Sequence, residues 1–126
     1  MSLDASGAKF WTGNHGWDGQ QATDPISGTS VTWGSWQHAV VTLDDAGTAT
    51  VYINGTAVRQ KAGFTFRSSE QMPFMYNYLG RSAFWDNGDK NLVNARYYYF
   101  KIYDGALSAE QIKSLSDNSP LAVVNG

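Results

Sequence analysis

The sequence contains no cysteine, and only three of its 126 residues are proline. The absence of cysteine excludes a disulfide framework and a thiolate zinc site. No apolar run approaches the roughly 18 to 20 residues that a membrane-spanning helix needs, so no membrane span is predicted. The length is that of one domain, and we assign residues 1–126 to a single domain.

Charge is also scarce. Charged residues make up 16% of the chain and the formal net charge is −2, and the nine Lys and Arg side chains are scattered from Lys9 to Lys113. Because no basic cluster is available to neutralise phosphates, nucleic acid is excluded as an expected partner.

Aromatic residues (14%) and glycines (13) are abundant, a composition that favours short strands joined by turns. The clearest pattern is a three-stranded meander over residues 36–60. Its strands are predicted at 36–43, 48–53 and 56–59. They are separated by Asp44-Asp45-Ala46-Gly47 and by Asn54-Gly55, the strongest short signal for a type I′ hairpin turn.

Outside the meander, four short strands are predicted, at residues 8–11, 30–33, 64–66 and 77–81. Asp24-Pro25 and Ser27-Gly28 are typical of loops. The longest strand is expected at 92–103, with Tyr98, Phe100 and Ile102 on one face and Tyr97, Tyr99, Lys101 and Tyr103 on the other. Phe100 and Ile102 are candidates for the core.

One helix is predicted near the C-terminus. Ser108 and Gln111 form an S-x-x-Q capping box, and Glu110 is favourable in the first turn. The helix therefore covers about residues 108–116, with Leu107, Ile112 and Leu115 towards a sheet. Asp117 to Pro120 ends it.

Four motifs, in the right order, resemble those of laminin-G-like domains, which are concanavalin A-like jelly rolls. They are G-S-W-Q-H-A-V-V-T-L-D (34–44), T-V-Y-I-N-G (50–55), N-Y-L-G-R-S (77–82) and F-K-I-Y-D-G-A-L-S (100–108). The resemblance covers about residues 30–116. It implies an all-β, antiparallel two-sheet jelly-roll sandwich. It also implies a secreted, usually bacterial, multidomain parent, of the kind in which such modules accompany glycoside hydrolases.

The sequence departs from this family in two ways. The family has more strands before its W-x-H motif than 35 residues supply, so either the chain begins inside the domain or the sandwich is trimmed. A trimmed sandwich exposes a sheet edge, which favours a dimer through strand pairing. Tyr98 and Tyr99 also stand where the family places acidic residues.

Catalysis is not expected of this chain. Glycoside hydrolysis needs two carboxyl groups facing each other across the scissile bond, and no predicted strand carries two acids on one face. The only two glutamates are Glu70, in a loop, and Glu110, at the helix start. No G-x-S-x-G motif is present, and His38 is interpreted as a half-buried structural residue.

The remaining candidates are two binding sites on loops. Trp17 and Trp85, with Asp86 and Asn87, combine rings that stack on sugars with polar side chains that bind hydroxyls. For Trp85 the alternative is packing beneath its own loop. Asp86, Asp89 and Asn91 offer the oxygen ligands that calcium prefers, although Lys90 opposes a cation there and a solvated turn is the alternative.

The sequence therefore predicts a non-catalytic module that binds an extracellular glycan or a neighbouring domain of the same protein. Calcium is its only candidate cofactor. The alternative is a structural, adhesion or protein-interaction module with no sugar site, because sandwiches of this kind serve both roles.

Overall fold

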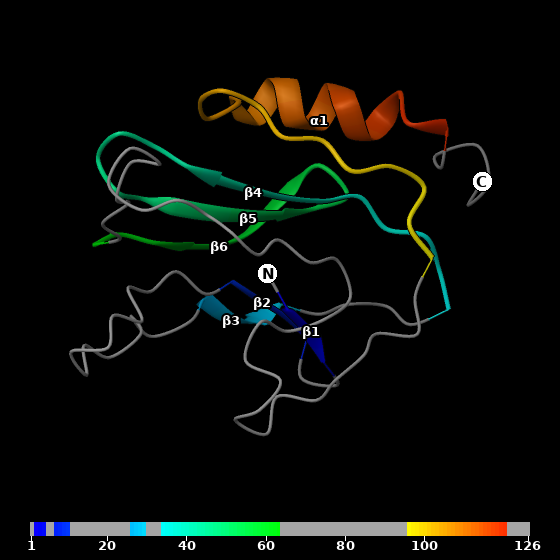
Figure 1. Ribbon diagram of the computed structural model, residues 1–126, viewed down its shortest axis with the longest axis horizontal. Helices are drawn as coiled ribbons and strands as arrows, with labels where there is room; N and C mark the ends of the chain where they lie inside the picture. Colours follow the sequence, from blue (N-terminus) through cyan, green and yellow to red (C-terminus); the bar gives the residue numbers. More distant parts are fainter. Residues whose placement is uncertain (1, 5–6, 11–25, 30–33, 64–95, 121–126) are drawn as a thin grey trace, which may run out of the picture. The chain divides into compact units, whose positions relative to one another are not determined.

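A computed structural model (Figure 1) describes residues 2–4, 7–10, 26–29, 34–63 and 96–120. The chain divides into two compact units, Met1–Thr65 with Tyr103–Gly126, and Phe66–Ile102. The first unit contains two three-stranded antiparallel sheets and one helix. The strands predicted at 30–33, 64–66 and 77–81 lie outside the described residues.

One sheet has the order β1-β2-β3, formed by Ser2–Asp4, Gly7–Phe10 and Ile26–Thr29. Strand β2 confirms the strand predicted near residue 8, but the loop expected at Ser27-Gly28 is wrong because these residues lie inside β3. The pairing shifts by one residue between Ala8–Thr29 and Phe10–Ile26. A glycine inside a strand commonly marks such a bulge, and Gly28 is therefore compatible with an edge strand.

The second sheet has the order β4-β5-β6, formed by Ala39–Leu43, Ala49–Ile53 and Thr56–Lys61. It confirms the predicted meander, although β4 begins three residues later than expected. Ala49 and Val51 are completely buried, and Val41, Leu43 and Val58 pack against them. Thr50 and Tyr52 of β5 are also buried. Both faces of the central strand β5 are therefore buried, whereas the alternating sequence predicted one buried face and one exposed face.

Hydrogen bonds and backbone angles within the two turns explain why the sequence predicted the meander correctly. The Asp44 carboxylate accepts the Thr48 N–H at 2.8 Å, closing the first turn. In the second turn Asn54 (φ 49°) and Gly55 (φ 78°) adopt the two positive φ values of a type I′ turn. The Asn54 side-chain oxygen also accepts the His38 N–H at 2.9 Å, which ties the turn to the residue just before β4.

Helix α1, Ala109–Asp117, lies against the β4–β6 sheet (Figure 1) and contacts β6. Both hydrogen bonds of the predicted capping box are present. The Ser108 hydroxyl accepts the Gln111 N–H, and the Gln111 side chain accepts the Ser108 N–H at 2.8 Å. Ile112 is completely buried, while Leu107 and Leu115 are half-buried. Burial of Ile112 contributes about 1.5–3 kcal/mol, more than any cap, so packing holds the helix in place.

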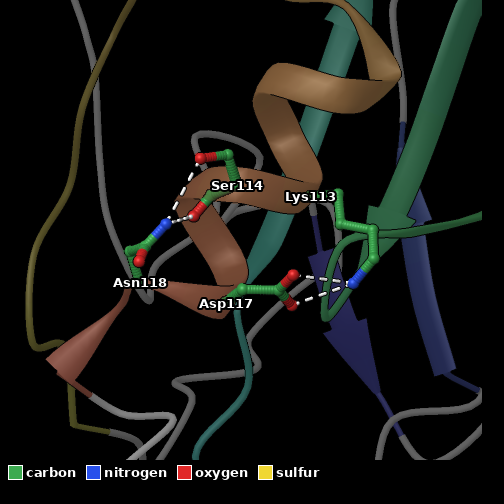
Figure 2. Close-up of polar contacts among 4 residues, drawn as sticks. All are labelled: Lys113, Ser114, Asp117 and Asn118. Atoms are coloured by element: carbon green, nitrogen blue, oxygen red, sulfur yellow. Dashed lines mark hydrogen bonds and ion pairs between the residues drawn. The ribbon is translucent and has the colours of Figure 1, made fainter.

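The C-terminal turn of α1 is closed by polar contacts on its surface (Figure 2). The Lys113 ammonium contacts the Asp117 carboxylate at 2.7 Å, one helical turn apart. Asn118 donates from its side chain to the Ser114 carbonyl at 2.8 Å. The helix therefore ends at Asp117, as predicted.

A second prediction is wrong in the described part of the chain. Residues 96–103 were expected to complete the longest strand, but none of them is in a strand. Phe100 and Ile102, expected in the core, are 61% and 85% exposed. A strand exists only where a neighbour offers a ladder, and local β-propensity cannot supply that neighbour.

Candidate functional site

The site residues predicted from the sequence lie outside the described residues. They are Trp17, Trp85, Asp86 and Asn87 for a glycan, and Asp86, Asp89 and Asn91 for calcium. Their grouping into a glycan site and a calcium site stays a prediction. Among the described residues, no group of three His, Asp or Glu side chains could hold a metal ion.

The described chain instead presents an aromatic segment, residues 96–104. Every residue of it is exposed, and six carry large aromatic or aliphatic side chains. These six are Tyr97, Tyr98, Tyr99, Phe100, Ile102 and Tyr103. At about 150–250 Å² for each aromatic side chain, their exposed fractions amount to roughly 600 Å² of surface. The largest contiguous apolar patch of an ordinary monomer is about 300–600 Å² and is often functional.

Contacts within the segment orient its rings. The Tyr98 and Tyr99 rings meet edge to face, with centroids 6.0 Å apart and planes at 75°, an arrangement that the quadrupoles of aromatic rings favour. The Lys101 ammonium lies 5.2 Å from the centre of the Tyr99 ring. This contact places the Lys101 and Tyr99 side chains on one side of the backbone.

The residue types of the segment suit two kinds of ligand. Tyrosine combines an apolar ring with a polar tip, which fits a hydrated surface such as a sugar. Phe100 and Ile102 have no polar tip, and an apolar partner is needed to remove them from water. The sequence interpretation missed this surface because it assigned Phe100 and Ile102 to the core. The sequence did contain a signal for an exposed aromatic surface. Tyr97, Tyr99 and Tyr103 occupy the other side of the predicted strand, where a half-buried strand usually carries polar residues.

The surroundings of His38 and Glu110 shift the pKa values of both side chains. Partial burial lowers the pKa of His38 because it disfavours the charged imidazolium. A backbone hydrogen bond at Glu110, and then the hydrogen bond from the Ser108 hydroxyl at 2.8 Å, lower the pKa of Glu110. Glu110 is therefore part of the helix start, whereas the His38 side chain is half-buried just before β4.

The described strands, the type I′ hairpin and the capped helix define an antiparallel β module with one helix. The chain also matches a known protein family. The Concanavalin A-like lectin/glucanases superfamily, in its laminin-G subgroup, matches residues 1–113, and the chain belongs to this family. The concanavalin A-like fold is a β-sandwich, which confirms the predicted architecture at that level.

A solved structure is also similar. It is a crystal structure of an S-layer domain-containing protein (residues 221–444) from Clostridium thermocellum, with a TM-score of 0.60 and 28% sequence identity. The match covers 77% of this chain and 48% of the other, so this chain spans about half the length of its structural relative. The comparison with curated proteins finds no match. No helix in the described residues is long and apolar enough to cross a membrane.

Proposed function

We propose that this chain is a non-catalytic binding module of a secreted or cell-surface multidomain protein, and that its ligand is an extracellular glycan. The observation that carries the proposal is the exposed tyrosine run, Tyr97 to Tyr99, on a domain of a lectin-containing family. Sugar rings present C–H faces that stack on tyrosine, while the phenol oxygen and the neighbouring Lys101 amine bind hydroxyls.

The location at a bacterial cell surface is supported by the S-layer domain-containing relative. An accessory role beside carbohydrate-active or adhesion domains belongs to the same proposal, because modules of one fold serve several parent proteins. The glycan is then a component of the cell wall or of the surroundings of the cell.

Two acidic residues of the described chain support a module without catalysis of its own. Asp44 closes the β4–β5 turn and Glu110 accepts a hydrogen bond at the helix start. Both are thereby engaged in local structure. A glycosidase instead needs two carboxyl groups about 5 to 9.5 Å apart across a cleft.

The loop tryptophans belong to the proposal as a second contact surface. Trp17 and Trp85 would stack on the same glycan, with Asp86 and Asn87 binding its hydroxyls. Asp86, Asp89 and Asn91 would supply three of the six to eight oxygens that calcium takes, with carbonyls and water completing the set. Oxygen donors of this type fit calcium, and the charge of Lys90 would weaken the site.

Tryptophan fluorescence during titration with plant, bacterial and mucin-type polysaccharides tests the proposal, with and without calcium. We expect a saturable change with at least one polysaccharide. Tyr97→Ala and Tyr99→Ala should each weaken binding roughly threefold to tenfold, the value of one stacked ring. The control Ile102→Ala removes an exposed side chain without a ring and should leave the affinity unchanged. A folded protein that responds to no polysaccharide would contradict the glycan proposal.

A protein-interaction module is the second candidate, and the exposure of Phe100 and Ile102 favours it. Neither side chain carries a polar tip that could bind a sugar hydroxyl. Both would be buried by another protein surface.

A further inference from the structure

We infer that the aromatic segment pairs with the same segment of a second copy of this chain, as two antiparallel strands related by a two-fold axis at Phe100. This inference goes beyond glycan binding and does not depend on it. It rests on the exposure of the segment, the self-complementary order of its residues and its area.

Every residue of the aromatic segment is exposed. The segment carries the β-branched and aromatic residues typical of a strand, yet it lies in no strand of the structure. Phe100 and Ile102 remain mostly in water. Long, apolar, strand-forming stretches at the surface are the usual template for pairing with another chain.

The order of residues identifies the partner. Two copies of the segment, run antiparallel about Phe100, place Tyr99 opposite Lys101 and Tyr98 opposite Ile102. The same register places Tyr97 opposite Tyr103 and, at the ends, Arg96 opposite Asp104. Every pair is of a type that stabilises adjacent strands, namely cation–π, aromatic–aliphatic, aromatic–aromatic and opposite charge.

The charges single out this register. Arg96, Lys101 and Asp104 are the charged residues of the segment. A centre one residue earlier, at Tyr99, places Arg96 opposite Ile102 and Lys101 opposite Tyr97, which leaves the guanidinium against an aliphatic side chain. The centre at Phe100 gives two Arg96–Asp104 pairs per dimer, because a two-fold interface repeats each contact.

The contact between Lys101 and Tyr99 agrees with this pairing. Within one chain the ammonium already lies over the ring, at 5.2 Å. Opposite strands bring Cβ atoms to about 4.5–5.5 Å. Once the segment straightens at Tyr98, where the single chain bends, the partner's Lys101 ammonium reaches the same ring.

The area fits a dimer. A stable interface buries about 800 Å² on each partner. The six large side chains offer roughly 600 Å², and the backbone of the added strand supplies more. A small ligand would leave most of this surface in water, whereas a second copy covers a larger share of it.

Sedimentation velocity over a wide range of concentration measures the association directly. We expect a concentration-dependent dimer in the absence of any glycan. Arg96→Asp and Asp104→Arg should each weaken the dimer at least ~10-fold, because each creates two like-charge pairs per dimer. The double variant restores opposite charges and should recover dimerisation. Exchanging Lys113 and Asp117, an exposed pair on α1, is the matched control and should have no effect.

A cysteine scan tests the register independently, because the natural chain has no cysteine. Opposed residues of antiparallel strands have Cα atoms about 4.5–5.5 Å apart, within the range of a disulfide. In the proposed register only residue 100 meets its own copy. Phe100→Cys should therefore cross-link to a homodimer fastest, whereas Tyr98→Cys and Ile102→Cys should cross-link efficiently only when mixed with each other.

A protein that stays monomeric at every concentration would overturn the inference. So would cross-linking at equal rates from positions 98, 100 and 102, which indicates non-specific contact. Association that requires an added polysaccharide or another protein would assign the segment to that partner instead. None of these results bears on whether a monomer binds a glycan, so the two proposals can fail separately.

Discussion

Gly55 lies where the β5–β6 turn meets helix α1. A Cβ atom at this position would lie 3.1 Å from the Lys113 Cα and 3.1 Å from the Ser116 Cβ. Its φ of +78° also disfavours any residue with a side chain. The close approach of turn and helix therefore depends on the absence of a side chain.

Gly55→Ala should lower the free energy of unfolding by about 2–4 kcal/mol, the sum of backbone strain and overpacking. Gly63→Ala is the control, because Gly63 has a similar φ of +88° with nothing within 4 Å of the added Cβ. It should cost about 1–2 kcal/mol, from backbone strain alone. Urea denaturation of both variants measures the difference, and equal losses would show that the helix can shift away from the turn.

His38 makes stability depend on pH. Burial lowers its folded-state pKa below the ordinary value of 6.5. Between the ordinary and the lowered pKa the unfolded state binds more protons than the folded state. Stability is therefore full above about pH 6.5 and falls as the pH decreases through the window below it.

His38→Gln should abolish this dependence. The variant and the natural protein should differ most in free energy of unfolding at neutral pH, and the difference should shrink as the pH falls below about 6.5. Glu110 does not interfere, because its lowered pKa places its own loss of stability below its ordinary value of 4.5. Parallel curves in chemical denaturation from neutral pH to pH ~5 would show that His38 does not titrate differently in the two states.

At the scale of elements, helix α1 carries two surface contacts, an N-cap hydrogen bond and an ion pair, that differ in their contribution to stability. The Ser108 hydroxyl accepts the Gln111 N–H at 3.2 Å, satisfying a backbone donor that the helix itself cannot. The Lys113–Asp117 pair is 2.7 Å long, but its side chains are 66% and 56% exposed, so water screens it. Distance alone is therefore a poor guide to energy here.

Ser108→Ala should lower the free energy of unfolding by about 1 kcal/mol. Lys113→Ala should lower it by no more than about 0.5 kcal/mol. Ser108→Asp, which keeps an acceptor at the N-cap, should restore most of the loss. Thermal and urea denaturation of the three variants give this ranking, and a larger loss in Lys113→Ala than in Ser108→Ala would contradict it.

The elements that the sequence predicted correctly are those fixed by neighbouring residues. Asn54-Gly55 specifies a type I′ turn, and Ser108 with Gln111 specifies a helix start, whatever surrounds them. Strand β3 and the aromatic segment were predicted incorrectly because their state depends on a distant partner. Gly28 is tolerated in β3 at a bulge against β2, while Phe100 has strong β-propensity and lies in no strand.

The candidate surface was out of reach for the same reason. Periodicity identified two faces of the aromatic segment, with Phe100 and Ile102 on one and Tyr97 and Tyr99 on the other. It could not show whether another part of the chain covers either face, because coverage is a property of the folded chain. The exposure of these side chains turned a predicted core strand into a candidate binding surface.

At the scale of the whole molecule, the two proposals use opposite faces of one segment. In the strand pair that we infer, side chains alternate along each extended chain, so Tyr97, Tyr99 and Lys101 would share one side, and Tyr98, Phe100 and Ile102 the other. The tyrosine side suits a hydrated glycan, and the apolar side suits packing between two copies. A dimer would then present two tyrosine surfaces side by side, which raises the avidity for a polymeric glycan.

Variants of the two faces should therefore separate the two activities. Tyr97→Ala with Tyr99→Ala should weaken binding to a short oligosaccharide, with a smaller loss of dimerisation. Phe100→Ser with Ile102→Ser should abolish the dimer and leave the affinity for a short oligosaccharide unchanged, because a monomer retains one tyrosine surface. The same variant should bind a long polysaccharide at least ~10-fold more weakly, since it loses the second attachment point. Calorimetry with short and long chains, beside sedimentation, tests this pattern. Equal losses for both chain lengths would show that the apolar side chains belong to the glycan site itself.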